Sequence, residues 1–367
     1  MQQWHLDFQR QIFGNSVATL SYVGSKGTHL TRQRDLNQVH SLPLSQNPYK
    51  PGEPIGGGDN SHDDCGTMTT PSGAFVTGQA ATNLEIACLA DANTFRPFVG
   101  FAPINRLEAE ASSTYHAFQA SLRRSVGALQ FSFAYTYSHA IDNSSDRFDS
   151  NFVDSYIPAS NRASSNLDQR HVLNVCYVYD LPFPKGTRMA HRVLGGWQVS
   201  GITTFQTGTP FSVVNQAFYG DNAGAGNFYG SGSFADLTGD PHSPPPVKFV
   251  EGIPGPLLFN PAAYAAPRGL TFGNSGRNSL RNPRRTNFDM ALLKRFSVSE
   301  TMKFEFRVEA FNIFNHTQWA SINSGLNCYA GPSNSAGDPT CIAASNFLHP
   351  GSAYRSRVLQ LGLKLIF

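Results

Sequence analysis

The last twelve residues, SRVLQLGLKLIF, alternate strictly between large apolar side chains and other side chains. In an extended strand successive side chains point to opposite faces, so one face carries Leu359, Leu361, Leu363, Leu365 and Phe367. The opposite face carries Val358, Gln360, Gly362 and Lys364. One face therefore requires an apolar medium while the other tolerates water. A soluble β-sandwich and an outer-membrane β-barrel both meet that requirement.

The composition favours an all-β fold. Charged residues make up 14% of the 367 residues, against about 25% in ordinary soluble domains. The chain is rich in Gly (33), Phe (28), Pro (23) and Tyr (13), which favour strands and turns over helices. A net charge of +3 with no run of basic residues gives no reason to expect a nucleic-acid partner.

Alternation with a period of two predicts nine strands. The clearest is LQFSFAYTYSH, residues 129–139, in which Leu129, Phe131, Phe133, Tyr135 and Tyr137 share one face. Most of the nine have about the ten residues that a tilted membrane strand needs. We expect strands at 2–12, 15–25, 113–126, 128–139, 169–181, 195–207, 286–296, 301–312 and 355–367.

The connections between these strands alternate between short and long. Short ones are expected near Gly14 and Gly127, at 182–194 and at 297–300; long ones at 26–112, 140–168, 208–285 and 313–354. Short turns at one end and long loops at the other are typical of an outer-membrane barrel, whose short turns are periplasmic and whose long loops are extracellular. No run approaches the roughly 18 apolar residues of a membrane-spanning helix.

The odd strand number indicates an incomplete barrel. With long loops outside, the first strand starts at the external side, whereas bacterial barrels usually have an even number of strands. The segment MQQWHLDFQRQIFGN has no basic and apolar stretch typical of a signal peptide. We therefore expect residues 1–367 to be the C-terminal part of a larger outer-membrane barrel, with no plug domain and no signal peptide.

Several segments together resemble the barrel of TonB-dependent outer-membrane receptors, and most of all the Oar-like subgroup that carries a carboxypeptidase-regulatory domain. They are RHVLNVCYVYDLPF, GGWQVSGITTFQTGTPFSV, GNSGRNSLRNPRRTNFDMALLKRFSV and MKFEFRVEAFNIFNHTQW, together with the terminal Phe367. The resemblance implies a 22-stranded barrel with a plug, which imports a nutrient using energy from the TonB complex. It also implies that Phe367 is a signal for the barrel-assembly machinery. No part of the chain matches a plug or a TonB box.

Candidate lumen-facing charges lie on two of the expected strands. In KFEFRVEAF, Phe304, Phe306 and Val308 share one face, and Glu305, Arg307 and Glu309 share the other. Because Arg or Lys on the lipid face costs about 2–4 kcal/mol near mid-membrane, the charged face is expected in the lumen. The same expectation holds for Asp289 and Arg295. These side chains either contact a plug or a solute, or only pair with one another.

A cluster of arginines is expected where the third long loop returns to the barrel. Guanidinium groups pair bidentately with phosphate and carboxylate, so this rim could bind lipopolysaccharide phosphates or an anionic solute. The alternative is that the arginines pair with carboxylates of the loops. The candidates are Arg277, Arg281, Arg284 and Arg285.

The expected long loops also contain cysteines and acidic residues. We predict two loop-closing disulfides, Cys65–Cys88 and Cys328–Cys341, with Cys176 unpaired in a strand. A zinc site near His62 is disfavoured because the chain has no CxxC pair. The segment GGGDNSHDDCG offers oxygen ligands for calcium at Asp59, Asp63 and Asp64, without the spacing of an EF-hand.

The remaining motifs point away from catalysis. There is no GxSxG, HExxH or P-loop, so we expect neither an enzyme nor a cofactor. Aromatic residues suited to the two membrane interfaces are Trp4, Tyr137, Tyr179, Trp197 and Trp319. The expected partners are outer-membrane lipid and lipopolysaccharide, TonB, the assembly machinery and an unidentified substrate. Two alternatives are a soluble or surface-exposed glycan-binding β protein and a gene fragment without function.

Overall fold

The computed structural model describes most of the chain. The described residues are 1–38, 40, 41, 43, 45, 97–98, 104–147, 154–182, 195–215, 233–245, 247–265, 267, 271–297, 302–326 and 346–367. Within them, no helix is long and apolar enough to cross a membrane.

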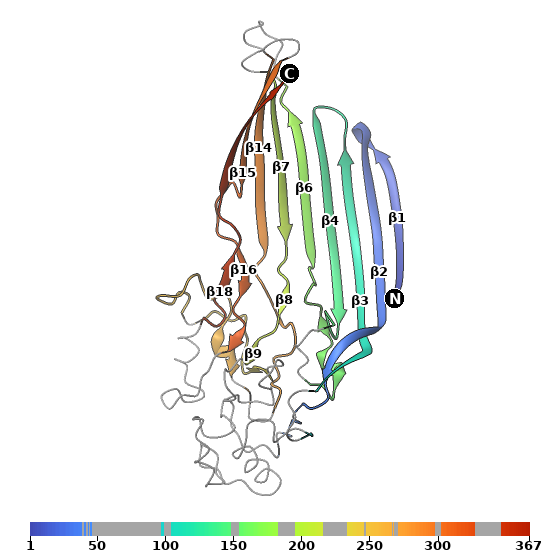
Figure 1. The fold of residues 1–367 in the computed structure, drawn as a ribbon, viewed down its shortest axis with the longest axis vertical. Helices are drawn as coiled ribbons and strands as arrows, with labels where there is room; N and C mark the ends of the chain where they lie inside the picture. Colours follow the sequence, from blue (N-terminus) through green and yellow to red (C-terminus); the bar gives the residue numbers. More distant parts are fainter. Residues whose placement is uncertain are drawn as a thin grey trace.

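One large antiparallel sheet dominates the fold (Figure 1). Nine long strands follow one another across it: β1 (Gln2–Ile12), β2 (Ser16–Asp35), β3 (Asn105–Arg124), β4 (Leu129–Asp142), β6 (His171–Asp180), β7 (Trp197–Gln206), β14 (Arg285–Ser297), β15 (Lys303–Phe311) and β19 (Val358–Ile366). The short strand β5 (Ala163–Ser164) pairs with the end of β4. The predicted all-β antiparallel fold is confirmed, and each of the nine expected strands is present.

The pairing register gives the sheet one apolar and one polar face. Residues directly opposite in antiparallel strands share a face, so Leu292 lies beside Val199 and Val308. Large apolar side chains of this face are exposed, including Leu6, Phe8, Leu20, Tyr22, Phe118, Tyr137, Phe296, Phe306, Leu361 and Leu363. An exposed apolar band of this extent is suited to lipid and not to water.

The two ends of the sheet differ as expected. At one end the strands are joined by short segments, such as the 3₁₀ turn η1 (Phe13–Asn15) between β1 and β2. All long connections leave from the other end, which is the lower end in Figure 1. In outer-membrane barrels this long-loop end is extracellular.

The strands β2 and β3 are longer than the sequence predicts. Each has 20 residues, and the pair extends beyond its neighbours through register shifts between Gly27 and Arg32. The extension is held by the buried guanidinium of Arg32, which bonds Glu108 at 2.6 Å and Glu110 at 2.8 Å. The sequence did not predict this extension, because charged residues occupy alternate positions and leave the segment without an apolar face.

The third and fourth long connections are folded together in part. Their described residues include the short strands β8 (Pro210–Phe211), β9 (Val214–Asn215), β10 (Ser233–Phe234), β11 (Asp236–Leu237), β12 (Tyr264–Ala265), β13 (Leu280–Arg281), β16 (Trp319–Ile322), β17 (Gly325–Leu326) and β18 (Pro350–Ala353), with the 3₁₀ turn η6 (Pro261–Ala263). They enclose a hydrophobic core of Val213, Ala235, Leu257, Ala263, Tyr264, Leu280, Ile322, Leu326, Phe347 and Leu348. Burial raises the pKa of Tyr264 to about 12. We call this unit the loop core.

The face assignment predicts a large difference between two neighbouring residues of β14. Leu292→Lys places an ammonium on the apolar face and should destabilise the sheet in lipid by about 2–4 kcal/mol. Ala291→Lys, which faces the polar side, should cost less than about 1 kcal/mol. Denaturant titration of tryptophan fluorescence in lipid vesicles measures both. Equal losses for the two variants would contradict the face assignment.

Candidate functional site

The candidate site is the polar face of the sheet together with the rim at its long-loop end. On β14 and β15 this face carries all five predicted lumen charges, because Asp289 and Arg295 share the register of the charged row of β15. The Arg295 Nε lies 3.4 Å from Glu305, and the Arg307 Nη2 lies 2.8 Å from Glu309. Lys364 of β19 lies opposite Glu305. β15 therefore presents a row of alternating charge, next to Asp289 and Arg295 of β14 and Lys364 of β19.

Asp289 also has a structural contact. Its carboxylate accepts a hydrogen bond from the backbone N–H of Asn312 at 2.8 Å. Asn312 has a φ of 51° and directly follows β15. Asn tolerates this left-handed conformation better than most residues. The contact anchors the chain where it leaves the sheet for the fourth long connection.

The central strands present an almost uncharged polar wall. From β4 to β7 this face consists mainly of hydroxyl and amide side chains, including Gln130, Ser132, Thr136, Asn174, Gln198, Ser200 and Thr204. Thr204 donates to Asn174 at 3.0 Å, and Gln198 donates to Asp180 at 2.7 Å. A hollow of about 410 Å³ lies over this wall, bordered by Arg123, Asp289, Arg307 and Glu309.

Two of the predicted rim arginines are paired with carboxylates. Arg277 is buried, and its Nη1 lies 2.7 Å from the Asp142 carboxylate at the end of β4. Its Nη2 donates to Ser145 at 2.8 Å. Arg281 pairs with Asp168. Both arginines thus connect the third long connection to the second.

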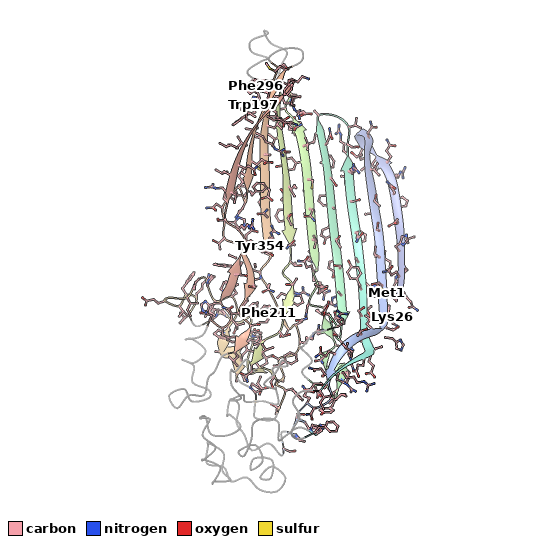
Figure 2. The ribbon with its side chains drawn as sticks, viewed as in Figure 1. Met1, Lys26, Trp197, Phe211, Phe296 and Tyr354 are labelled. Carbon is pink, nitrogen blue, oxygen red and sulfur yellow. The ribbon has the colours of Figure 1, made fainter. Side chains whose placement is uncertain are left out.

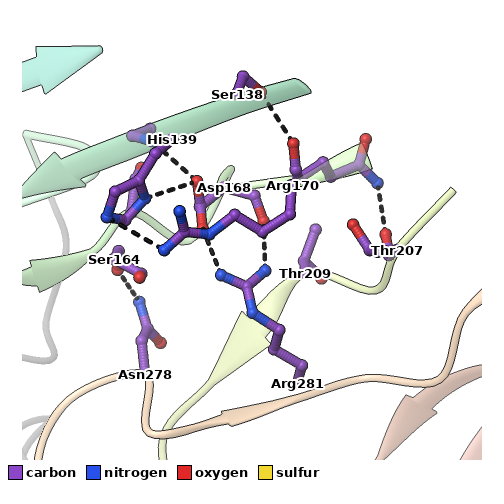
Figure 3. Close-up of polar contacts among 12 residues, drawn as sticks. Ser138, His139, Ser164, Asp168, Arg170, Thr207, Thr209, Asn278 and Arg281 are labelled. Atoms are coloured by element: carbon purple, nitrogen blue, oxygen red, sulfur yellow. Dashed lines mark hydrogen bonds and ion pairs between the residues drawn. The ribbon is translucent and has the colours of Figure 1, made fainter. Parts of the chain in front are cut away.

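Asp168 is the centre of a polar cluster that the sequence did not reveal (Figure 3). Its side chain is fully buried and contacts Arg281, the Arg170 Nε at 3.3 Å and the His139 Nδ1 at 3.1 Å. It also accepts from the Ala140 N–H at 2.7 Å. Burial raises the pKa of Asp168, but the hydrogen bonds from Ala140, Arg281 and His139 outweigh burial and lower the pKa overall.

The other two rim arginines have no such carboxylate. Arg284 is exposed, and Arg285 begins β14 with its guanidinium 4.4 Å from the ring centroid of Tyr354. Among the described residues, no ion pair joins either of them to Asp or Glu. The rim arginines therefore fall into two groups with different environments.

The aromatic residues divide between the ends of the sheet and the loop region. Trp4 on β1 lies across Gly24 of β2, where any larger residue would collide with the indole, and its ring lies 6.0 Å from that of His116. Tyr179 and Trp197 are on β6 and β7 near the short-turn end, and Tyr137 is on β4 toward the long-loop end. Trp319 instead lies in β16, beside Gly255 and outside the large sheet.

Lys294 is a cation on the apolar face that sequence reasoning missed. It is buried, and its ammonium donates to the Gly195 carbonyl near the short-turn end. The ammonium also lies 5.2 Å from the Trp197 ring and 5.0 Å from the Phe296 ring, two residues that Figure 2 places together at this end. Contacts of this kind let a long basic side chain cross an apolar surface to a polar boundary.

The predicted disulfides and the calcium candidates lie outside the described residues. These are Cys65, Cys88, Cys328 and Cys341, and Asp59, Asp63 and Asp64. Cys176 is a free thiol on β6 and is exposed. Its register with Ser132 and Ile202 places it on the polar face, within the lining of the hollow. Phe367 directly follows β19 and is 95% exposed.

These features define an outer-membrane β-barrel protein: a sheet with a lipid-compatible outer face, a polar inner face and long connections at one end only. Residues 1–360 match the model of the outer membrane beta barrel domain family. The chain belongs to that family, and the protein is located in the outer membrane. Membership also weighs against the soluble alternative.

Solved structures of outer-membrane transporters and receptors resemble the chain. The transporter YddB from Escherichia coli has 7% sequence identity and a TM-score of 0.43, over 99% of this chain and 32% of that protein. The receptor FpvA from Pseudomonas aeruginosa, bound to pyoverdine, has 9% identity and a TM-score of 0.41, over 100% of this chain and 29% of that protein. The chain thus spans about a third of the length of either structure. Among curated proteins, none matches the sequence.

Asp168→Asn should loosen the rim locally. The change leaves Arg170 and Arg281 beside a neutral group, and because both are partly exposed we expect a local loss of roughly 1–3 kcal/mol. Hydrogen exchange of peptides covering 138–142 and 164–170 should accelerate by about tenfold or more. Asp240→Asn is the control, since that carboxylate bonds the His242 amide within its own turn. Equal acceleration in both variants would contradict the role of Asp168.

The same cluster should be sensitive to acid. The folded pKa of Asp168 is below its ordinary value of 3.8. The ionised carboxylate therefore contributes fully to the stability of the cluster above pH 3.8, and this contribution is lost as the pH falls through the lower, folded pKa. Exchange protection of the Ala140 amide should therefore decrease below about pH 4 in the wild type. Asp168→Asn should lack this step. A wild-type profile that is flat down to pH 2 would contradict the assignment.

Cys176 offers a direct test of the inner face. In a variant whose other four cysteines are serine, a charged, water-soluble maleimide should modify Cys176 in lipid vesicles. Moving the thiol one residue, with Val175→Cys and Cys176→Ser, places it on the apolar face and should slow labelling at least tenfold, because successive residues point to opposite faces. Labelling at the same rate would show that lipid does not cover that face.

Proposed function

We propose that the chain is the C-terminal part of the barrel of a TonB-dependent outer-membrane receptor of the Oar-like kind, which takes up a nutrient from outside the cell. The observation that carries this proposal is the geometry of the two free edges of the sheet. Family membership and the outer-membrane location support it.

Both edges run in the same direction. The strands alternate in direction from β1 to β19, and with nine strands in the path the first and the last are parallel to each other. Joining β1 directly to β19 would therefore give a parallel pair. A wholly antiparallel barrel requires an odd number of further strands between them. Thirteen further strands would complete the 22-stranded barrel of this receptor class, an odd number as required.

The direction of the two edges also disfavours closure by a second copy of this chain. Two copies in the same membrane orientation would join β19 of one copy to β1 of the other, again as parallel neighbours. The missing strands are therefore best supplied by a barrel segment of different sequence. Together with a plug, that segment would supply the contact with TonB.

Within this receptor the parts of the chain have separate tasks. The charged residues of β14 and β15 suit contact with a plug, since they offer paired charges that another polar surface can join. The neutral wall of the central strands suits the passage of a solute. The long loops with the loop core suit capture of the substrate, and the exposed Phe367 at the end of β19 suits recognition by the assembly machinery.

An antibody against the loop core tests this proposal in the native bacterium. The chain should be found in the outer-membrane fraction, in a polypeptide well above 40.0 kDa, and that polypeptide should cross-link to TonB. A 40 kDa product in the soluble fraction, or a large membrane product that does not cross-link to TonB, would contradict it.

A further inference from the structure

The strongest unassigned feature is a group of arginines at the long-loop end of β14 and β19. Arg285 begins β14, and Arg355 and Arg357 lie directly before β19. Arg355 and Arg357 are exposed. Unlike Arg277 and Arg281, none of the three forms an ion pair with a carboxylate of the described residues. This part of the rim thus has an excess of positive charge.

Arg285 is held in place by an aromatic side chain. Its guanidinium lies 4.4 Å from the centroid of the Tyr354 ring, within the range of a cation–π contact. The Arg285 Nε is buried and has no hydrogen-bond partner. A planar cation stacked in this way keeps its terminal N–H groups in a fixed plane for a ligand.

One buried residue aligns both members of this stack. The Gln318 carbonyl accepts from the Tyr354 N–H at 2.8 Å, and its side-chain Oε1 accepts from the Thr286 N–H at 3.0 Å. Its Nε2 donates to Asn287 at 3.2 Å. Because Gln318 fixes the backbone next to Arg285 and at Tyr354, little conformational entropy remains to be lost when a ligand binds.

The register directs Arg285 toward the lumen. Arg285 lies opposite Gln206, on the face that also carries Asn287 and Asp289. The nearest acid along this face, Asp289, already accepts the Asn312 amide, and Glu309 on the next strand pairs with Arg307. Tyr354 lies where the sheet meets the loop region (Figure 2). The stacked guanidinium therefore stands at the entrance of the lumen.

We propose that Arg285, stacked on Tyr354, binds an anionic group, carboxylate or phosphate, of a soluble solute as it enters the lumen. This inference rests on the proposed uptake function and specifies its substrate class. A lumen-facing position favours a soluble anion over the headgroup of a surrounding lipid.

Binding of pyrophosphate to the outer-membrane polypeptide that contains residues 1–367, purified in neutral detergent, tests the proposal by ³¹P line broadening and calorimetry. Arg285→Gln should weaken binding at least tenfold, in line with the loss of a charge-assisted bidentate contact. Arg284→Gln removes the same charge one residue away, outside the strand, and should change affinity less than twofold. Far-UV circular dichroism must be unchanged in both.

Two further variants separate the effect of the Tyr354 ring on binding from the effect of the Arg285 charge. Tyr354→Leu removes the ring and should weaken pyrophosphate binding about threefold, whereas Tyr354→Phe keeps the ring and should bind as the wild type does. Equal losses for Arg284→Gln and Arg285→Gln, or no pyrophosphate binding by the wild type, would overturn the proposal.

A measurement of lipid A binding distinguishes a soluble anion from a lipid headgroup as the ligand of this site. If Arg285→Gln abolishes binding of lipid A in mixed micelles but leaves pyrophosphate binding intact, the site serves a lipid headgroup and the proposal is wrong. These measurements need neither TonB nor transport. A failure here therefore leaves the uptake function standing, and a failure of TonB cross-linking does not affect the result here.

Discussion

Pairing of backbone polar groups in lipid is the constraint on which the rest of this structure depends. An unpaired N–H or C=O in the hydrocarbon region costs several kcal/mol, so each membrane strand needs a neighbour on both sides. Seven of the nine long strands have two such neighbours, whereas β1 and β19 have one each. The directions of those two edges underlie our proposal that an odd number of antiparallel strands, from a segment of different sequence, completes the barrel.

The same register that satisfies the backbone also sorts the side chains. Because directly opposite residues share a face, a single alternation propagates from β1 to β19, with aromatic and aliphatic side chains outside and hydroxyl, amide and charged side chains inside. Lys294 departs from this rule and its ammonium reaches a carbonyl near the short-turn end. Arg10 and Arg124 depart from it at the same end of the sheet. On the inner face, charges are concentrated on β14 and β15, where Arg295 pairs with Glu305 and Arg307 with Glu309, and the central wall is almost uncharged.

The sequence predicted the parts of the molecule that follow a period of two. All nine long strands could be predicted, and so could the shared polar face of Glu305, Arg307 and Glu309, because lipid on one side imposes a strict alternation. The extension of β2 and β3 was missed because its charged residues, such as Arg32 and Glu108, are buried by pairing with one another.

The contacts at the rim could not be predicted for a different reason. Arg277 meets Asp142 across 135 positions of sequence, and Arg281 meets Asp168 across 113. No local pattern encodes contacts between separate loops. The loop core was also missed, since its short strands have two to four residues and carry no period. The arginine cluster at 277–285 was visible in sequence, but only the fold separates its paired members from Arg285.

The most direct test of this account is the behaviour of the purified 367-residue chain with and without detergent. A lipid-facing sheet predicts that the chain aggregates in plain buffer and becomes rich in β-structure, by far-UV circular dichroism, only after refolding into detergent or lipid. A stable, folded monomer in buffer alone would show that the apolar face is covered by protein, and would contradict the membrane barrel.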